Sequence, residues 1–346
     1  MSEAQLFRVG LTADFETLGR GLLGAALAEV LQPIPGILCE TMPETDGIAK
    51  AEVLDRYDAV VALDYYFPAA CFEGLERLGL IARWGVGYDR IEMPACTRAG
   101  VMVAITSDSV GRPVAEGILA MIFALAKGLP ALDRNCRAGR WWQDSPWIVN
   151  LGGRVLGSVG TGNIAGELFG MAKGLGFKRL LTYSRRQSWP EGEALGVELV
   201  DLETVLRESD FLTVNCRLNE RTRGMLGVHE LSLMKPTAYL INTARGPIVD
   251  EAALLDALRR RRIAGAGLDV FDEEPLPPGH PFSQLDNVIL TAHRIAKSEE
   301  CRRDTSLSAC RSVADFAQGR APRFVANPEV FDHPRVRMRL SQVTSN

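Results

Sequence analysis

Short apolar segments alternate with helix-like segments along almost the whole of this 346-residue chain. In the first hundred residues the strand-like segments are Val9–Leu11, Gly36–Cys39, Ala59–Leu63, Leu80–Trp84 and Val101–Ile105. A second series follows at Arg154–Val159, Leu180–Tyr183, Phe211–Val214, Ala238–Asn242, Ala266–Val270 and Val288–Thr291. This alternation is typical of parallel β-sheets with helices on both faces. Since a domain has about 150 residues, the sequence predicts an α/β fold with two domains.

Two long helices are predicted outside these strands. An amphipathic helix is expected to start near Arg112 and to run toward Lys127, with Pro113 in its first turn. The residues from Ser298 to about Gly319 predict a second helix. The segment after Pro328 is rich in charge, and we expect it to cover surface or to be partly disordered.

The composition argues against several classes of partner. Lys and Arg total 39 against 43 Asp and Glu, a net charge of -4, whereas nucleic-acid binders usually carry a basic excess. The most apolar stretch, Gly117–Ala126, is shorter than the roughly 20 residues of a membrane span. The polar N-terminus shows no signal peptide, and the seven cysteines include no C-x-x-C pair. We therefore expect a cytoplasmic protein with reduced thiols. The four dispersed histidines suggest no metal site.

A glycine-rich motif follows the strand that ends at Val159. The run Gly160-Thr-Gly162-Asn163-Ile164-Ala165 matches the G-x-G-x-x-G/A dinucleotide fingerprint, between a predicted strand and a predicted helix. Gly160 would allow the tight turn, and Gly162 would let the backbone approach a pyrophosphate. The N-terminus of the helix would offer N–H groups to the phosphates. A purely structural turn is the alternative, but strand, spacing and helix together favour nucleotide binding.

The end of the next strand bears on the choice of nucleotide. An NAD site would place Asp or Glu there, but this chain has Ser184, Arg185 and Arg186. The serine could hydrogen-bond the extra phosphate of NADP, and the arginines could pair with it. These residues favour NADP, with NAD still possible. The alternative is that the arginines are solvated surface.

Three segments farther along place polar residues just after predicted strands. They contain Arg245, Glu274 and His293. Open α/β sheets form their sites at the carboxyl ends of strands. Each residue also has a purely structural interpretation. Arg245 could form an ion pair, Glu274 could be an ordinary loop carboxylate, and His293 could be a buried structural histidine.

Together with Trp84–Asp89, Val114–Glu116 and Met234–Pro236, these segments resemble the D-2-hydroxyacid dehydrogenase family. The family includes glyoxylate/hydroxypyruvate reductases and phosphoglycerate dehydrogenases. The resemblance covers residues 55 to 320 approximately and identifies Arg245, Glu274 and His293 as a catalytic triad. His293 would exchange the hydroxyl proton, because the pKa of a histidine lies near the working pH. Glu274 would orient and stabilise its imidazolium, and Arg245 would hold the carboxylate and carbonyl of the substrate.

The resemblance implies further contacts. Val86 and Gly87 match main-chain N–H groups that hold the substrate carboxylate. Asp269 matches a contact to the nicotinamide carboxamide. Four residues match nucleotide contacts in the loops after strands. Thr243 and Ala244 match contacts near the nicotinamide ribose, and Cys216 and Arg217 match contacts near the adenosine. The thiol of Cys216 could equally be a small core group, and Arg217 could be surface.

Two features depart from the family pattern. Arg294 follows His293, where a small or apolar residue is usual, and would favour a substrate with a second anionic or polar group if it points inward. The Tyr65-Tyr66-Phe67 loop could pack over a larger, sugar-like substrate or simply line the core.

The resemblance implies two Rossmann-like domains with the active site in the cleft between them. Residues 1–106 with 298–346 would form a discontinuous substrate domain, and residues 107–297 the NAD(P)-binding domain. The predicted activity is hydride transfer between NADP(H) and a small 2-oxo or D-2-hydroxy acid, of the glyoxylate or hydroxypyruvate type. The alternatives are an NAD-dependent dehydrogenase of a sugar-acid-type substrate and a nucleotide-sensing protein like the dehydrogenase-related corepressors. Family members are usually homodimers, and we expect the same here, with the helix near Arg112 at the interface.

Overall fold

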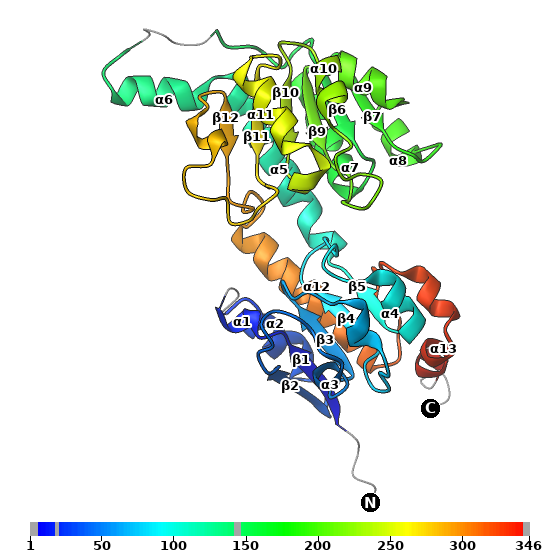
Figure 1. Ribbon diagram of the computed structural model, residues 1–346. Helices are drawn as coiled ribbons and strands as arrows, with labels where there is room; N and C mark the ends of the chain where they lie inside the picture. The colour runs from blue at the N-terminus through cyan, green and yellow to red at the C-terminus, as the bar shows by residue number, and fades with distance from the viewer. Residues whose placement is uncertain (1–5, 18–20, 142–146, 342–346) are drawn as a thin grey trace, which may run out of the picture. The chain divides into compact units, whose positions relative to one another are not determined.

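The chain divides into two compact units in the computed structural model, which describes residues 6–17, 21–141 and 147–341 (Figure 1). One unit is Met1–Val110 with Ser298–Asn346, and the other is Gly111–Lys297. Each unit is built around one parallel β-sheet, with helices packed around it (Figure 1). The predicted fold class, two α/β units with parallel sheets, is confirmed. The assignment of one unit to the substrate and the other to the cofactor stays a prediction.

The described part of the first unit contains a five-stranded sheet in the order β2-β1-β3-β4-β5. Both faces of this sheet are covered, because alternate residues of one strand belong to different hydrophobic clusters. Val60 and Ala62 lie in one cluster, and Ala59 and Val61 lie in the other. The strands are β1 (Phe7–Leu11), β2 (Ile37–Thr41), β3 (Ala59–Ala62), β4 (Leu80–Arg83) and β5 (Met102–Ala104). The helices around them are α1 (Asp14–Thr17), α2 (Gly24–Ala26), η1 (Leu27–Leu31), α3 (Ala51–Leu54), η2 (Ala69–Phe72) and α4 (Met93–Ala99).

The second unit contains a seven-stranded sheet in the order β12-β11-β10-β9-β6-β7-β8. The order reverses between β6 and β9, as in Rossmann folds, where ligands bind at such a switch point. The strands are β6 (Val155–Val159), β7 (Arg179–Tyr183), β8 (Val197–Val200), β9 (Phe211–Val214), β10 (Tyr239–Asn242), β11 (Gly265–Leu268) and β12 (Val288–Leu290). The helical segments are α6 (Leu129–Arg137), α7 (Asn163–Ala172), η3 (Lys173–Leu175), α8 (Pro190–Glu193), α9 (Leu202–Glu208), α10 (Val228–Leu233), η4 (Gly246–Ile248), α11 (Glu251–Arg259) and η5 (Pro281–Gln284). The sequence analysis missed the edge strand β8.

Helix α5 (Ser107–Ala126) begins five residues before the predicted start at Arg112, so Pro113 lies inside it rather than in its first turn. The extra turn is held by side chains that are remote in sequence. Thr305 donates to the Ser109 hydroxyl at 3.0 Å, and Ser308 donates to the Asp108 carboxylate at 2.7 Å. These tertiary hydrogen bonds offset the N–H group that the proline ring removes from the helix.

By length and composition, α5 is the one helix of the described residues that could cross a membrane. The apolar stretch recognised in the sequence, Gly117–Ala126, is only the second half of this helix, so the predicted apolar length was too short. More than half of its apolar window is buried inside the protein, and Ile118 and Ile122 are completely buried. Its packing is that of a core helix, for which the same length and composition are ordinary.

The C-terminal helices complete the first unit. Helix α12 (Glu299–Ala317), predicted over nearly the same residues, packs against β3 and β4. The charged segment after Pro328 covers the surface as η6 (Pro328–Asp332) and α13 (Pro334–Ser341), as far as the described residues extend. Val336 is buried there, and Arg335 donates to the main-chain oxygens of Glu76 and Leu78 at 2.8 and 3.2 Å.

Candidate active site

The glycine-rich loop connects β6 to α7 at the switch point of the seven-stranded sheet. Gly160 has a φ of +122°, and a Cβ atom there would lie 2.5 Å from the main-chain oxygen of Asn215. Only glycine fits this position. At Gly162, the N-cap of α7, the nearest atom would be 4.0 Å away, so the backbone is open to a close ligand. In the first turn of the helix, Asn163 is exposed, Ile164 is half-buried and Ala165 is completely buried.

Two unpaired polar atoms lie at the same edge of this sheet. Asn215 follows β9 and donates to the hydroxyls of Ser158 and Thr213 at 3.0 and 2.8 Å. Its Oδ1 is buried and has no hydrogen-bond partner in the described part of the chain, and the same holds for the hydroxyl of Thr243 after β10. Buried polar atoms normally find partners, so these atoms fit a polar ligand at the glycine loop, as a dinucleotide would be. The sequence analysis did not single out Asn215, although it too directly follows a strand.

The residues after β7 present cations and no carboxylate. Ser184 accepts a hydrogen bond from the main-chain N–H of Arg186 at 3.2 Å, and the side chains of Arg185 and Arg186 are exposed. Burial raises the pKa of the Cys216 thiol to about 11, although the nearby positive charge of Arg185 opposes this shift. Arg185, after β7, therefore lies near Cys216, after β9, so the two loops that contain the predicted nucleotide contacts are neighbours. Arg217 is exposed, and its main-chain oxygen accepts from Thr222 at 2.6 Å.

Arg245 follows β10 in a turn that Asn242 shapes. The amide of Asn242 donates to the main-chain oxygen of Arg245 at 2.9 Å and accepts from the N–H of Ala244 at 3.1 Å. Nη1 of Arg245 donates to the main-chain oxygen of Ala244 at 2.7 Å. The turn therefore holds one nitrogen of the guanidinium group of Arg245, whose side chain is partly exposed.

Glu274 and His293 form a hydrogen-bonded pair. Nδ1 of His293 lies 2.8 Å from Oε2 of Glu274, and the other oxygen of Glu274 accepts from the main-chain N–H of Phe271 at 3.0 Å. Burial of Glu274 opposes its ionisation, but these hydrogen bonds and the charges of His293 and Arg245 outweigh it and lower the pKa of Glu274. The carboxylate is therefore charged at neutral pH and faces both partners. Because Glu274 accepts the Nδ1 proton, Nε2 of His293 points to its other side, where no described residue hydrogen-bonds it.

The backbone at His293 adopts a left-handed conformation, with a φ of +51°. Asp269, which follows β11, maintains it from three directions. Its main-chain oxygen accepts from the N–H of His293 at 2.7 Å, and its carboxylate accepts from the N–H of Arg294 at 2.9 Å and from the hydroxyl of Thr291 at 2.5 Å. Asp269 is thus a support of the histidine turn, and its predicted contact with the nicotinamide stays a prediction.

The sequence-predicted substrate residues Val86 and Gly87 belong to the first unit. They follow β4, at the carboxyl edge of the five-stranded sheet. Among the described residues, neither main-chain N–H donates a hydrogen bond. Both are partly buried, so they are donors available to an anion.

The structure thus brings Arg245, Glu274 and His293 together in the second unit, after β10, β11 and β12. These strands lie side by side and run parallel, so their carboxyl ends share one edge with the glycine loop. Within the described ranges, no group of three His, Cys, Asp or Glu side chains could hold a metal ion. A dinucleotide loop beside a histidine–carboxylate pair defines a class of protein, the nicotinamide-dependent dehydrogenases.

Comparison with known proteins narrows this class. Residues 119–294 match the D-isomer specific 2-hydroxyacid dehydrogenase, NAD binding domain family. The chain is 38% identical over 290 residues to the glyoxylate reductase of Korarchaeum cryptofilum, covering 82% of this chain and 87% of that one. It is 39% identical over 261 residues to the glyoxylate reductase of Aeropyrum pernix, covering 73% and 78% of the two chains.

A solved structure agrees over nearly the full length. The NADPH-dependent glyoxylate/hydroxypyruvate reductase of Sinorhizobium meliloti, in complex with NADP and malonate, superimposes with a TM-score of 0.78 at 25% identity and covers 94% of this chain and 97% of its own. The chain belongs to the D-isomer-specific 2-hydroxyacid dehydrogenase family. It is an NAD(P)-dependent oxidoreductase of that family, as the sequence predicted.

Proposed function

We propose that this protein reduces a small 2-oxo acid of the glyoxylate or hydroxypyruvate type with NADPH, and catalyses the reverse oxidation of the D-2-hydroxy acid. The observation that carries the proposal is the 2.8 Å hydrogen bond between His293 and Glu274, which leaves Nε2 of His293 free. The two relatives at 38 and 39% identity, both glyoxylate reductases, support the substrate class.

In the reductive direction, protonated His293 donates the proton on Nε2 to the oxygen of the carbonyl group as it becomes a hydroxyl. Its Nδ1–H stays hydrogen-bonded to Glu274, whose negative charge stabilises the imidazolium before the transfer. When bound, the reduced nicotinamide supplies the hydride to the carbonyl carbon. In oxidation, neutral His293 accepts the hydroxyl proton at Nε2.

Arg245 is proposed to bind the substrate carboxylate and to polarise the carbonyl oxygen, because its guanidinium presents several donors in one plane. The unpaired N–H groups of Val86 and Gly87 would hold the same carboxylate. Residues 1–106 with 298–346 would then be the substrate domain, and 107–297 the cofactor domain.

The preference for NADP rests on Ser184, Arg185 and Arg186. A 2′-phosphate would meet two exposed guanidiniums and a hydroxyl there, whereas an acidic residue would repel it. The Sinorhizobium meliloti reductase, which is NADPH-dependent, supports the same choice.

A second candidate is an NAD-dependent dehydrogenase of a larger, sugar-acid-type substrate. Arg294 favours it, because its exposed side chain has no polar partner among the described residues and directly follows His293. The aromatic loop supports it less. Phe67 is completely buried, and Tyr65 is buried with its hydroxyl donating to Glu44 at 2.9 Å, so only Tyr66 is exposed to a ligand.

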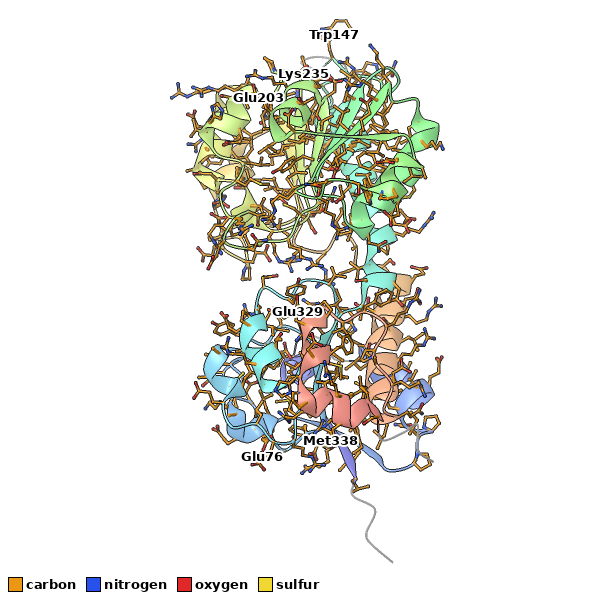
Figure 2. All side chains as sticks on the ribbon, turned by 90° about the vertical axis from the view of Figure 1, so that its right-hand side faces the viewer. Glu76, Trp147, Glu203, Lys235, Glu329 and Met338 are labelled. Carbon is orange, nitrogen blue, oxygen red and sulfur yellow. The ribbon has the colours of Figure 1, made fainter. Side chains whose placement is uncertain are left out.

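We also propose a cytoplasmic homodimer. Helix α6 projects from the body of its unit in Figure 1, and Trp147 lies at the outer tip of that unit in Figure 2. Exposed apolar side chains occur on α6 and on the segments before and after it in the sequence, namely Phe123 on α5, Leu129 at the start of α6, and Trp141, Trp147 and Ile148 after it. Trp142, in the same stretch of sequence, lies outside the described residues. Apolar surface of this kind is typical of an oligomer interface, and sedimentation that shows only monomer would refute this assembly.

The activity is tested by the loss of nicotinamide absorbance with glyoxylate and with hydroxypyruvate, using NADPH and NADH in parallel. We expect turnover with both acids and a higher kcat/KM for NADPH. Higher efficiency with NADH would refute the role given to Arg185 and Arg186. Binding of nucleotide without turnover of either acid would direct the search to sugar acids, and inactivity with those as well would identify a nucleotide-sensing protein.

A further inference from the structure

A second histidine–glutamate pair lies in the same unit as His293 and Glu274. Nε2 of His280 is 3.0 Å from Oε1 of Glu251. The other ring nitrogen of His280, Nδ1, accepts from the main-chain N–H of Phe282 at 3.3 Å, and the ring packs against the ring of Phe282 with centroids 5.1 Å apart. This arrangement assigns the proton of a neutral imidazole to Nε2, which donates it to Glu251.

The carboxylate of Glu251 joins two segments of the chain. Glu251 is the first residue of α11, directly after the N-cap Asp250. While Oε1 accepts from His280, Oε2 accepts from the main-chain N–H of Asp272 at 3.2 Å. Glu251 therefore links the segment that holds η5 to the segment after β11.

The main-chain amides of Phe271 and Asp272 connect this pair to the candidate catalytic residues. The N–H of Phe271 donates to Glu274, and the N–H of Asp272, the next residue, donates to Glu251. Gly246, which follows Arg245, packs against the same backbone segment. A Cβ atom at Gly246 would lie 2.0 Å from the carbonyl carbon of Phe271 and 2.5 Å from the nitrogen of Asp272. Two consecutive peptide groups thus carry the connection. The Phe271–Asp272 peptide packs on the Arg245 turn and donates to Glu251, and the N–H of the preceding Val270–Phe271 peptide donates to Glu274.

We propose that Glu251 and His280 are positioning residues. They fix the backbone at Phe271 and Asp272, so that the Phe271 N–H keeps the carboxylate of Glu274 within hydrogen-bond distance of His293. This inference rests on the proposed function and deepens it. A shift of about 1 Å in a supporting group can slow catalysis by about 100-fold, so the accuracy of this support matters for the rate.

The charges around Glu251 require a test that separates geometry from electrostatics. Asp272 lies near the charges of Glu251, Asp250 and Arg223. Burial and the two carboxylates raise the pKa of Asp272, although the positive charge of Arg223 opposes this shift. Glu251→Ala removes both the negative charge and the hydrogen-bond acceptor. Glu251→Gln removes the charge but keeps an acceptor oxygen for the Asp272 N–H.

The kinetic experiment compares these variants with glyoxylate and the nucleotide that wild type prefers. We expect Glu251→Ala to lower kcat by about 10-fold with little change in the KM for nucleotide, and Glu251→Gln to recover most of the loss. His280→Ala is expected to lower kcat as well, and His280→Gln, whose amide offers one donor and one acceptor, to recover it. The matched control is Glu203→Ala, on the exposed face of α9 in the same unit (Figure 2). In the part of the chain that the structure describes, the Glu203 side chain pairs only with Arg207. It should leave kcat unchanged.

A double-mutant cycle tests whether Glu251 acts through Glu274. If it does, adding Glu251→Ala to Glu274→Gln should lower kcat little further, because the carboxylate that it orients is already gone. Independent, multiplied losses in the double variant would overturn the proposal. So would equal kcat values for wild type and Glu251→Ala.

An NMR measurement that needs no substrate tests the positioning role separately from the proposed enzymatic function. The chain has four histidines, so the imidazole signals in NMR can be assigned by substitution, and the ring signals of His293 can be followed directly. Glu251→Ala should shift the signal of the His293 Nδ1 proton, because the hydrogen bond to Glu274 is disturbed, and Glu251→Gln should restore it. An unchanged signal in a folded Glu251→Ala protein would overturn the positioning role, even if wild type turned over no 2-oxo acid. Inactive wild type with the expected shift would overturn only the proposed function.

Discussion

The two histidine–glutamate pairs of the second unit use the same side chains in different surroundings. In the pair His293–Glu274 the side chains are 46% and 36% exposed, and in the pair His280–Glu251 they are 16% and 25% exposed. His280 uses both ring nitrogens within the protein, whereas His293 uses only Nδ1 among the described residues. A histidine whose nitrogens are both occupied can support a loop but has no free nitrogen for a substrate. The difference in hydrogen bonding therefore distinguishes the pair proposed as catalytic from the pair proposed as positioning.

The backbone makes the same distinction. His293 stands in a left-handed conformation that Asp269 maintains, and such conformations occur mainly where function requires them. His280 has a φ of −50° and serves as the N-cap of η5. Its conformation is ordinary, and its position follows from local capping.

The largest effect is expected from His293→Asn. Asparagine tolerates the left-handed backbone, so the turn should persist while the proton donor is lost. We expect kcat to fall by about 1,000-fold with unchanged nucleotide affinity, since general acid–base groups contribute roughly 100- to 10,000-fold. Steady-state kinetics and calorimetric titration with NADPH measure the two quantities. A loss below 10-fold would show that His293 is not the proton donor.

A smaller loss is expected from Glu274→Gln. The amide can still accept from Nδ1 of His293, but it carries no charge to stabilise the imidazolium. We expect kcat in the reductive direction to fall by about 100-fold and the pH–rate profile to shift toward lower pH, because the proton on His293 is held less strongly. An unchanged profile in a folded variant would contradict the role given to Glu274.

Gly246→Ala should disturb both pairs at once, because the new Cβ would meet the Phe271–Asp272 peptide. We expect a loss of about 2 kcal/mol in the free energy of unfolding, together with a lower kcat. Urea denaturation and kinetics measure these. The control is Gly170→Ala in α7, where a Cβ meets nothing within 4 Å; it should be neutral or slightly stabilising. Equal stabilities of the two variants would refute the close contact at Gly246.

The smallest effect concerns pH. The pKa of Glu274 is lowered in the folded protein, so its ionised form stabilises the fold at pH values above the ordinary glutamate pKa of about 4.3. That contribution is lost as the pH falls through the lowered pKa. The difference in unfolding free energy between wild type and Glu274→Gln should therefore shrink as urea titrations are moved to acidic pH. A constant difference would contradict the shift.

Much of the second unit could be predicted from local sequence signals. The glycine loop was identified because the spacing of Gly160, Gly162 and Ala165 is typical of a tight turn between a strand and a helix that binds a dinucleotide. The structure shows the reason at Gly160, where no other residue fits. Arg245 and His293 were selected because polar residues after buried parallel strands converge at one edge, which the strand order confirms.

Features that depend on distant partners were missed. Glu251 looks like an ordinary helix-start glutamate and His280 like a loop residue, and only folding brings them within 3.0 Å across 29 positions. The first turn of α5 was likewise missed, because the hydroxyls that hold it come from α12. Strand β8 was missed although three of its four residues are apolar. It is a short edge strand, and of its side chains only Val197 is buried.

By itself, the sequence determined the alternation of strands and helices, the nucleotide-binding turn and the identity of the candidate catalytic side chains. These depend on local periodicity, on glycine's backbone freedom and on the chemistry of each residue type. Only the tertiary structure showed that Nε2 of His293 has no hydrogen-bond partner among the described residues, whereas both ring nitrogens of His280 have one. It also showed that Glu251 hydrogen-bonds the backbone next to the residue that holds Glu274. Hydrogen-bond partners are set by the packing of segments far apart in the chain, and no local pattern records them.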